Sequence, residues 1–266
     1  MTKDILIMKP LSGTFFGLFL VFLLLFTGLC IAARKRDEAF RGRLLAGIMF
    51  GTLLLFFVYK YVLFVDPEYS GLTAEAGIGG FNWWGELPLH LCNINMILIP
   101  IAVLTKKRPL MSFCFFMGPL GAAMALLMPS AGFEAYSLLE PRILCYFVTH
   151  WLVFFGSLSL CGFGLYKPNF RDILPTVITA LLLAFAIFLV DILLRKIGVD
   201  PHSNYFFAVE TEGNPILELF YSWLPYPFLY LMPCVLILVP YAVIVLLLLR
   251  LIDKLFPGKN RTQKKA

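Results

Sequence analysis

No charged residue interrupts the segment from Leu11 to Ala33, which reads LSGTFFGLFLVFLLLFTGLCIAA. A helix rises about 1.5 Å per residue, so a helix of this length crosses a hydrocarbon layer about 30 Å thick. The segment is longer than the apolar part of a signal peptide, and the residues around Cys30 do not form a small-residue cleavage site. We therefore expect a membrane-spanning helix here.

Six further segments are almost as apolar as the first. Hydrophobic residues make up 60% of the 266 residues and charged residues only 14%, which is too little polar surface for a soluble domain. Strand-like alternation is absent, so helices must satisfy the backbone inside the bilayer. The sequence predicts an all-α polytopic transmembrane bundle, a single domain over residues 1–266 with about seven helices, at Leu11–Ala33, Leu44–Val65, Leu87–Thr105, Leu110–Gly132, Ile143–Tyr166, Ile173–Leu194 and Phe228–Leu249.

Lysine and arginine are divided unevenly between the two ends of this bundle. Sixteen of the 22 lie in the loops after the first, third and fifth helices and in the C-terminal tail. Positive residues favour the cytoplasmic side, so we expect the N-terminus outside and the C-terminus in the cytoplasm. The other six lie on the opposite side, where Arg195 and Lys196 form the one adjacent pair that departs from the rule. Because orientation accounts for the net charge of +6, we expect no nucleic-acid partner.

The cysteines do not indicate a disulfide framework or a zinc site. They lie one at a time inside the apolar segments, without paired spacing. The sequence therefore predicts no metal site and no diffusible cofactor. The six are Cys30, Cys92, Cys114, Cys145, Cys161 and Cys234.

Strongly polar side chains inside the predicted helices are few and lie at similar depth. Such residues are costly in hydrocarbon and by default mark a site or a polar pair. His90, Cys92, Asn93 and Asn95 fall within two turns of the start of the third helix, and His150 lies in the outer half of the fifth. From the helical rise, Cys92 and His150 are roughly 8 Å and 12 Å below their helix starts. We expect them to share a pocket near the outer face.

Two charged residues fall in the same outer half of the bundle. Lys60 lies near the end of the second helix and Asp191 near the end of the sixth. They could contact a substrate headgroup. The residues themselves favour the alternative, in which the two form a structural pair or act as snorkelling and capping groups.

Helical phase suggests which residues could act together. His90 and Asn93 are three apart and would share a helix face, whereas Cys92 would point about 160° away from His90. His150 is then the natural base for a Cys92 nucleophile, with Asn93 or Asn95 orienting the imidazole or donating to an oxyanion. The alternative is structural, because buried cysteine is often an inert small side chain and a membrane histidine often bonds another helix.

The segment Glu86-Leu87-Pro88-Leu89-His90-Leu91-Cys92-Asn93 resembles the LPLHLC signature of YwaF-like bacterial integral membrane proteins. A second similar block runs through Asn204-Tyr205 and Asn214-Pro215 to Leu224-Pro225-Tyr226-Pro227. There Leu224 and Tyr226 replace the usual Gly and Trp. The resemblance extends from the third helix to the seventh and implies the cytoplasmic membrane of a bacterium.

YwaF-like proteins look distantly similar to eukaryotic multispanning acyltransferases that act on ether lysophospholipids, with a membrane Cys and a His on a later helix. The resemblance implies a lipid acyltransferase or acyl hydrolase whose partners are membrane lipids, as acyl donor and lysolipid acceptor. Cys92 would be the nucleophile, His150 the base and Asn93 the oxyanion donor. His90, Asn95, Lys60 and Asp191 would contact the substrate.

Two other classes of function remain open from the residues. One is a lipid or small-solute transporter or flippase, against which the nearly apolar inner halves of the helices argue. The other is a non-enzymatic partner of another membrane protein.

Overall fold

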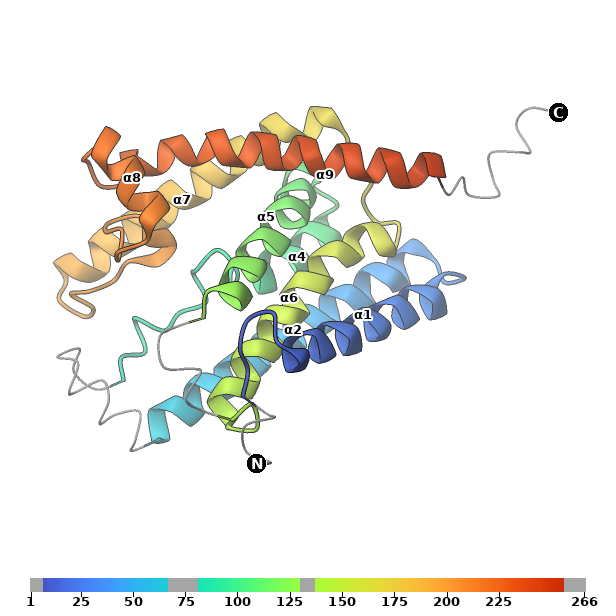
Figure 1. Ribbon diagram of the computed structural model, residues 1–266, viewed down its shortest axis with the longest axis horizontal. Coiled ribbons are helices and arrows are strands. Elements are labelled where there is room, and N and C mark those ends of the chain that lie inside the picture. Colours follow the sequence, from blue (N-terminus) through green and yellow to red (C-terminus); the bar gives the residue numbers. More distant parts are fainter. Residues whose placement is uncertain (1–6, 67–80, 130–136, 256–266) are drawn as a thin grey trace.

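The structure, a computed structural model, describes residues 7–66, 81–129 and 137–255 (Figure 1). In these ranges six helical stretches are long and apolar enough to cross a membrane. The predicted all-α transmembrane bundle is therefore confirmed. The stretches are α1 (Gly13–Ala33), α2 (Glu38–Val65), α5 (Arg108–Leu127), α6 (Pro141–Gly162), Phe170–Lys196 with α7 (Ile173–Lys196), and Leu229–Leu255 with α9 (Val235–Leu255).

Local capping signals set where these helices begin. The Ser12 side chain accepts a hydrogen bond from the backbone of α1, and the Asp37 carboxylate does the same for α2, at 3.2 Å and 2.6 Å. Proline lies in the first turn of α5 and of α6, where its missing N–H leaves no backbone acceptor unpaired. A cap bond or a proline thus accounts for one of the free N–H groups at the start of each of these four helices.

The predicted third helix, Leu87–Thr105, is wrong in its first half. Only α4 (Asn95–Thr105), with 11 residues, is helical, and residues 82–94 form a series of turns. The Leu87 N–H donates to the side chain of Tyr205, far along the chain, at 2.8 Å. A tertiary contact therefore holds the backbone in turns where hydropathy alone favours a helix.

Other predicted boundaries shift by a few residues. The helix expected over Leu110–Gly132 ends at Leu127, and residues 130–132 lie outside the described ranges. The helix expected over Ile143–Tyr166 ends at Gly162, two residues before Gly164, which takes a left-handed conformation with φ of 67°.

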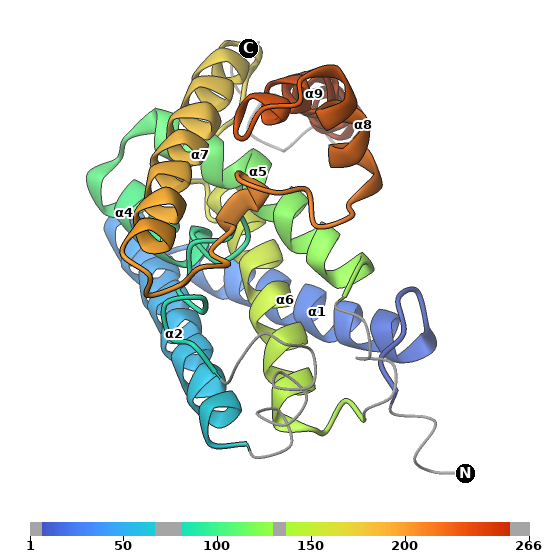
Figure 2. The same cartoon turned by 90° about the vertical axis from the view of Figure 1, so that its left-hand side faces the viewer.

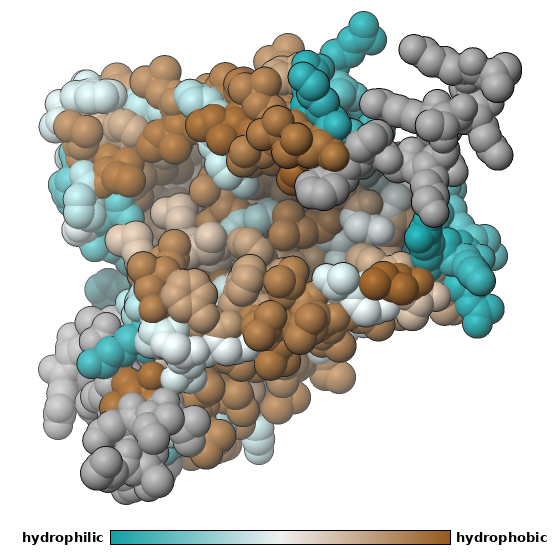
Figure 3. All heavy atoms as spheres, turned by 45° about the vertical axis from the view of Figure 1, so that its right-hand side comes forward, coloured by the Kyte–Doolittle hydropathy of each residue, from teal (hydrophilic) through white to brown (hydrophobic). Residues whose placement is uncertain are grey.

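The helices are arranged around α5 and α6 (Figures 1 and 2). α7 and α9 lie on one side of α5, and α1 and α2 lie on the other side with α6. Among the 18 most apolar consecutive residues of each helix, 67% are buried in α5 and 61% in α6. The corresponding share is only 17% in α1 and in the stretch that contains α9. The outer helices therefore present most of their apolar surface to lipid. Figure 3 shows hydrophobic residues across the middle of one face and hydrophilic residues towards its ends.

Polar contacts mark one end of the bundle, here called the basic end. Lys106, after α4, pairs with Glu38 at the start of α2 at 2.7 Å. Arg108, at the start of α5, pairs with Asp172 at 2.7 Å. The loops after α1, α4 and α6 therefore meet there, as the predicted topology requires.

The opposite end is covered by the connection from α7 to α9. It contains the short helices η4 (Tyr205–Phe207) and α8 (Pro215–Trp223). Phe206 and Phe207 both have positive φ, 58° and 53°, which is strained for residues with a side chain. Surrounding contacts must compensate for this strain, so the connection is a folded element rather than an unstructured linker.

Candidate functional site

Tyr205 fixes the turns that precede the cysteine motif. Its hydroxyl donates to the Trp84 carbonyl at 2.5 Å and accepts from the Leu87 N–H at 2.8 Å. The side chain of Asn82 adds a hydrogen bond to the Val199 carbonyl at 3.0 Å. Burial raises the pKa of the Tyr205 hydroxyl well above its usual range, so it remains a neutral donor. Two distant segments are thereby joined at this end.

The segment that carries Tyr205 is held by Asp191 at the end of α7. The Asp191 carboxylate accepts from Ser203 Oγ at 2.7 Å and from the Tyr205 N–H at 3.0 Å. The Asn204 side-chain oxygen accepts from two backbone N–H groups further along, at 2.9 Å and 3.0 Å. We call residues 199–212, which these bonds organise, the cap. Asp191 thus supports the cap.

Lys60 also holds the turn segment. Its ammonium forms a salt bridge with Glu86, and it lies over the rings of Tyr59 and Phe56 at 4.8 Å and 5.2 Å. A pairing of Lys60 with Asp191, one of the options left open by the sequence, is therefore wrong. Each has its own partner at this end of the molecule.

His90 lies under the cap. Its ring makes an edge contact with Tyr205 at a centroid distance of 5.0 Å and a tilted contact with Phe207 at 6.1 Å. It is also close enough to Lys60 and His150 for electrostatic interaction. His90 therefore connects the cap with the polar group on α6.

Cys92 lies in the last turns before α4. Its thiol donates to the Asn93 side-chain oxygen at 3.6 Å, and Asn93 is 8% exposed. A Cβ on Gly121 of α5 would lie 3.3 Å from the Cys92 backbone nitrogen, so glycine allows this close approach. The motif thus packs against α5.

His150 is a buried residue of α6 with one nitrogen committed to the backbone. Its Nδ1 lies 2.7 Å from the carbonyl oxygen of Tyr146, one turn earlier, and the two rings are 4.3 Å apart. A carbonyl oxygen only accepts, so Nδ1 carries the proton and Nε2 has the lone pair in the neutral ring. The Tyr146 hydroxyl donates to the Ala125 carbonyl of α5 at 2.8 Å. This arrangement leaves Nε2 able to accept a proton.

Asn95 points into the contact between α5 and α6. Its amide nitrogen donates to the Leu91 carbonyl at 2.7 Å, and its buried oxygen has no hydrogen-bond partner. A Cβ on Gly118 would lie 3.4 Å from this oxygen and 1.9 Å from Ser157 Oγ, which also lacks a partner. Asn95 therefore supports helix packing beside the motif.

The predicted site residues fall into two groups. In the first group, His90 lies against the cap, Lys60 pairs with Glu86, the Cys92 thiol bonds to Asn93 and His150 bonds to Tyr146. In the second, Asn95 faces the helix contact and Asp191 holds the cap. Sequence reasoning missed Tyr146, Tyr205 and Glu86 as partners. The spacing of Tyr146 and His150 by one helical turn predicts that the two side chains are neighbours.

The described residues hold no group of three or more His, Cys, Asp or Glu side chains able to bind a metal ion. Two hydrogen bonds define the polar groups of this region: the Cys92 thiol donates to the Asn93 side chain, and His150 Nδ1 donates to the Tyr146 carbonyl.

The family comparison covers nearly the whole chain. The model of the TMEM164 family matches residues 9–249, which include the cysteine motif, α6 and the cap. No curated protein and no solved structure gives a match. The match confirms the predicted multispanning membrane family, while the likeness to YwaF-like proteins stays a prediction. The chain belongs to the TMEM164 family.

Proposed function

We propose that this protein is a thiol-dependent lipid acyltransferase or acyl hydrolase. The oriented imidazole of His150 carries the proposal, because its Nδ1 lies 2.7 Å from the Tyr146 carbonyl oxygen and Nε2 is left as the proton acceptor. A histidine on α6 and a cysteine in the turns that pack on α5, the helix against which α6 packs, fit a nucleophile–base pair. The location within apolar helices fits a substrate drawn from the membrane.

The chemical steps follow from this pairing. A thiol attacks only after it loses its proton, and His150 Nε2 accepts that proton from Cys92. The thiolate attacks the carbonyl carbon of a lipid ester, the carbon–oxygen bond to the glycerol breaks, and the imidazolium protonates the departing alkoxide. The acyl group is now a thioester. A lysolipid hydroxyl, deprotonated by His150, then attacks the thioester and releases Cys92; water in place of the lysolipid gives hydrolysis.

The other predicted residues support these steps. Asn93 accepts from the Cys92 thiol through Oδ1, so its amide nitrogen is the group that can donate to the oxyanion. Lys60 and His90 lie within electrostatic reach of the pair and would contact the polar part of the lipid. We propose that Asp191 acts on the substrate only through the cap that it holds.

A lipid-like electrophilic probe tests this assignment. The full chain in detergent or vesicles is labelled, and the modified cysteine is located by peptide mass spectrometry. Labelling is expected at Cys92 and is lost in Cys92→Ala. In His150→Ala it is slowed by about 10²–10⁴-fold, the usual contribution of a general base.

Cys30→Ala is the matched control, because this half-buried cysteine lies on α1, in a groove at the basic end. It is expected to label as the unmodified chain does. Unchanged labelling in both Cys92→Ala and His150→Ala, with the fold retained, would reject the catalytic pair. Flux of lipid across vesicles that survives the loss of Cys92 would favour transport instead.

A further inference from the structure

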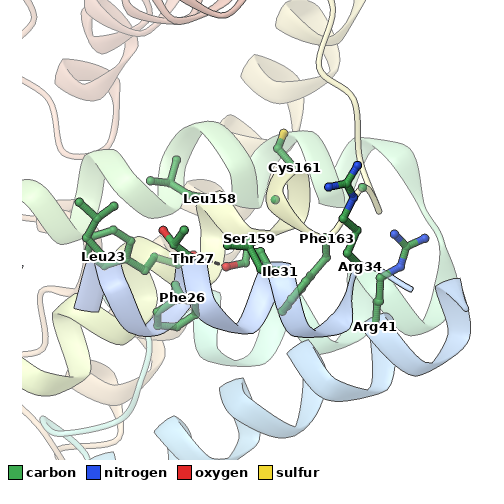
Figure 4. A pocket seen from close by; sticks show the side chains of 14 residues that line it. Leu23, Phe26, Thr27, Ile31, Arg34, Arg41, Leu158, Ser159, Cys161 and Phe163 are labelled. Atoms are coloured by element: carbon green, nitrogen blue, oxygen red, sulfur yellow. Dashed lines mark hydrogen bonds between the residues drawn. The ribbon is translucent and has the colours of Figure 1, made fainter. Parts of the chain in front are cut away.

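A groove between α1 and α6 lies at the basic end of the molecule. Its volume is about 520 Å³, and its walls are mostly apolar. Figure 4 shows Leu23 and Phe26 towards one end of the groove and the guanidinium groups of Arg34 and Arg41 at the other. The groove therefore combines a long apolar floor with a cationic end.

The groove opens on the side of α1 that would face the lipid bilayer. Thr27 and Leu23, on α1, are exposed wall residues, and α1 is only 17% buried in its most apolar window. Leu23 and Arg34 are eleven residues apart, which is roughly 16 Å along a helix. This length matches about half of a hydrocarbon core of about 30 Å, that is, one leaflet. A lipid in one leaflet could therefore lie along it.

The guanidinium groups at the cationic end have no salt-bridge partner among the described residues. Neither Arg34 nor Arg41 forms a salt bridge there, and Arg41 Nε is buried without a hydrogen-bond partner. Glu38, whose charge interacts with Arg41, is paired with Lys106 at 2.7 Å. A buried guanidinium donor without a partner is unfavourable, and an anion that accepts from it removes that cost.

We propose that this groove binds an anionic glycerophospholipid. Arg34 and Arg41 contact the phosphate, and one acyl chain lies along Leu23, Phe26 and Leu158. The groove is separate from the pair on which the proposed function depends. Ser159 and Cys161 line it, and they are nine and eleven residues past His150, roughly 13–16 Å along α6.

Native mass spectrometry of the delipidated full chain tests the proposal. The protein is titrated with phosphatidylglycerol and, separately, with phosphatidylcholine of the same acyl chains. Phosphatidylglycerol is expected to bind as a single tight ligand. The double variant Arg34→Gln with Arg41→Gln is expected to weaken this binding about tenfold or more, the effect of losing two charge-assisted hydrogen bonds.

The charge-matched control changes Arg36→Gln and Arg43→Gln, which are exposed residues near the same loop that do not line the groove. It is expected to bind as the unmodified chain does. If this control loses as much phosphatidylglycerol binding as the Arg34→Gln, Arg41→Gln variant, anions are attracted to the basic loop in general and the proposal is overturned.

A second variant tests the apolar half of the groove without changing charge. Thr27→Trp places a large ring in the groove, whereas Val21→Trp places it on an exposed part of α1 outside the groove. Binding is expected to fall in the first and persist in the second. Phosphatidylglycerol binding that survives Thr27→Trp would indicate an anion site without an acyl-chain groove and would contradict the proposal. Inorganic phosphate that displaces phosphatidylglycerol equally well from the Thr27→Trp and Val21→Trp variants would contradict it in the same way. Size-exclusion profiles confirm that each variant is folded.

Discussion

At the residue scale, single hydrogen bonds decide which groups are available for chemistry. The Tyr146 carbonyl accepts a hydrogen bond from His150 Nδ1, and the Asn93 side-chain oxygen accepts one from the Cys92 thiol. Both contacts lie between near neighbours in sequence, one in the turn segment before α4 and the other on α6. The chemistry of the pair therefore depends on the backbone that positions it.

Tyr205→Phe tests the link between the cap and the cysteine motif. The change leaves the Leu87 N–H and the Trp84 carbonyl without their shared partner. We expect it to lower the free energy of unfolding by about 1–3 kcal/mol and to speed amide exchange at Leu87. Calorimetry and hydrogen-exchange mass spectrometry measure both.

Tyr226→Phe is the control, because this tyrosine is 61% exposed and lies outside the cap. We expect it to change neither quantity. If Tyr205→Phe behaves like Tyr226→Phe, the hydroxyl is not what holds the turn segment.

At the element scale, close contact between α5 and α6 gives the site its rigid floor. Gly118 and Gly121 let Ser157 and the Cys92 backbone approach α5, so the turn segment packs directly on two central helices. Small residues commonly permit such approach between membrane helices. The position of the motif is thus set by its packing on α5, which carries none of the proposed catalytic groups.

Gly118→Ala tests this packing. The new methyl group would lie 1.9 Å from Ser157 Oγ, so we expect a loss of about 1–3 kcal/mol in stability. Adding Ser157→Gly removes the clashing side chain and should recover much of that loss. Gly47→Ala meets no atom within 4 Å and should be neutral or slightly stabilising. Thermal unfolding compares the four proteins; no difference between Gly118→Ala and Gly47→Ala would contradict the packing.

Element positions were largely predictable, but the geometry of the motif was not. Hydropathy located the six long helices because burial in lipid needs only length and apolarity. It failed at residues 87–94, where the Leu87 N–H donates to the hydroxyl of Tyr205, more than a hundred residues away in the sequence. The phase comparison of His90 with Cys92 assumed a helix in those residues and therefore does not apply. The contact of Tyr146 with His150 could have been predicted from the sequence, since Tyr146 lies one helical turn before His150.

At the scale of the whole molecule, two polar ends enclose an apolar middle. Salt bridges tie the loops at the basic end, and the cap closes the opposite end. The proposed catalytic pair lies near the cap and the proposed lipid groove near the basic end. The two sites would therefore serve lipids in different leaflets.

Asp172→Ala tests how the basic end is held together. Its buried carboxylate accepts from Arg108 at 2.7 Å and 2.8 Å, from the Tyr166 hydroxyl at 2.9 Å and from the Asn169 N–H at 2.8 Å. We expect a stability loss of about 2–3 kcal/mol, because charged hydrogen-bond partners lose their acceptor. Glu38→Gln breaks an exposed pair and should change stability little. Equal effects in thermal unfolding would contradict this account.

The orientation predicted from lysine and arginine is a separate expectation. If the positive-inside rule holds, the C-terminal tail and the basic end face the cytoplasm. A cysteine introduced at Lys264 should then react with an impermeant maleimide only after the membrane is opened. Reaction in intact cells would reverse the assignment of the two ends.

The formation of an acyl-thioester on Cys92 tests the central claim most directly. The full chain is incubated with a diacyl phospholipid and the intact protein is weighed by mass spectrometry. We predict a single acyl adduct on Cys92 that neutral hydroxylamine removes, absent in Cys92→Ala and strongly reduced in His150→Ala. Lipid product that accumulates while Cys92 stays unmodified, or an adduct on another cysteine, would contradict the claim.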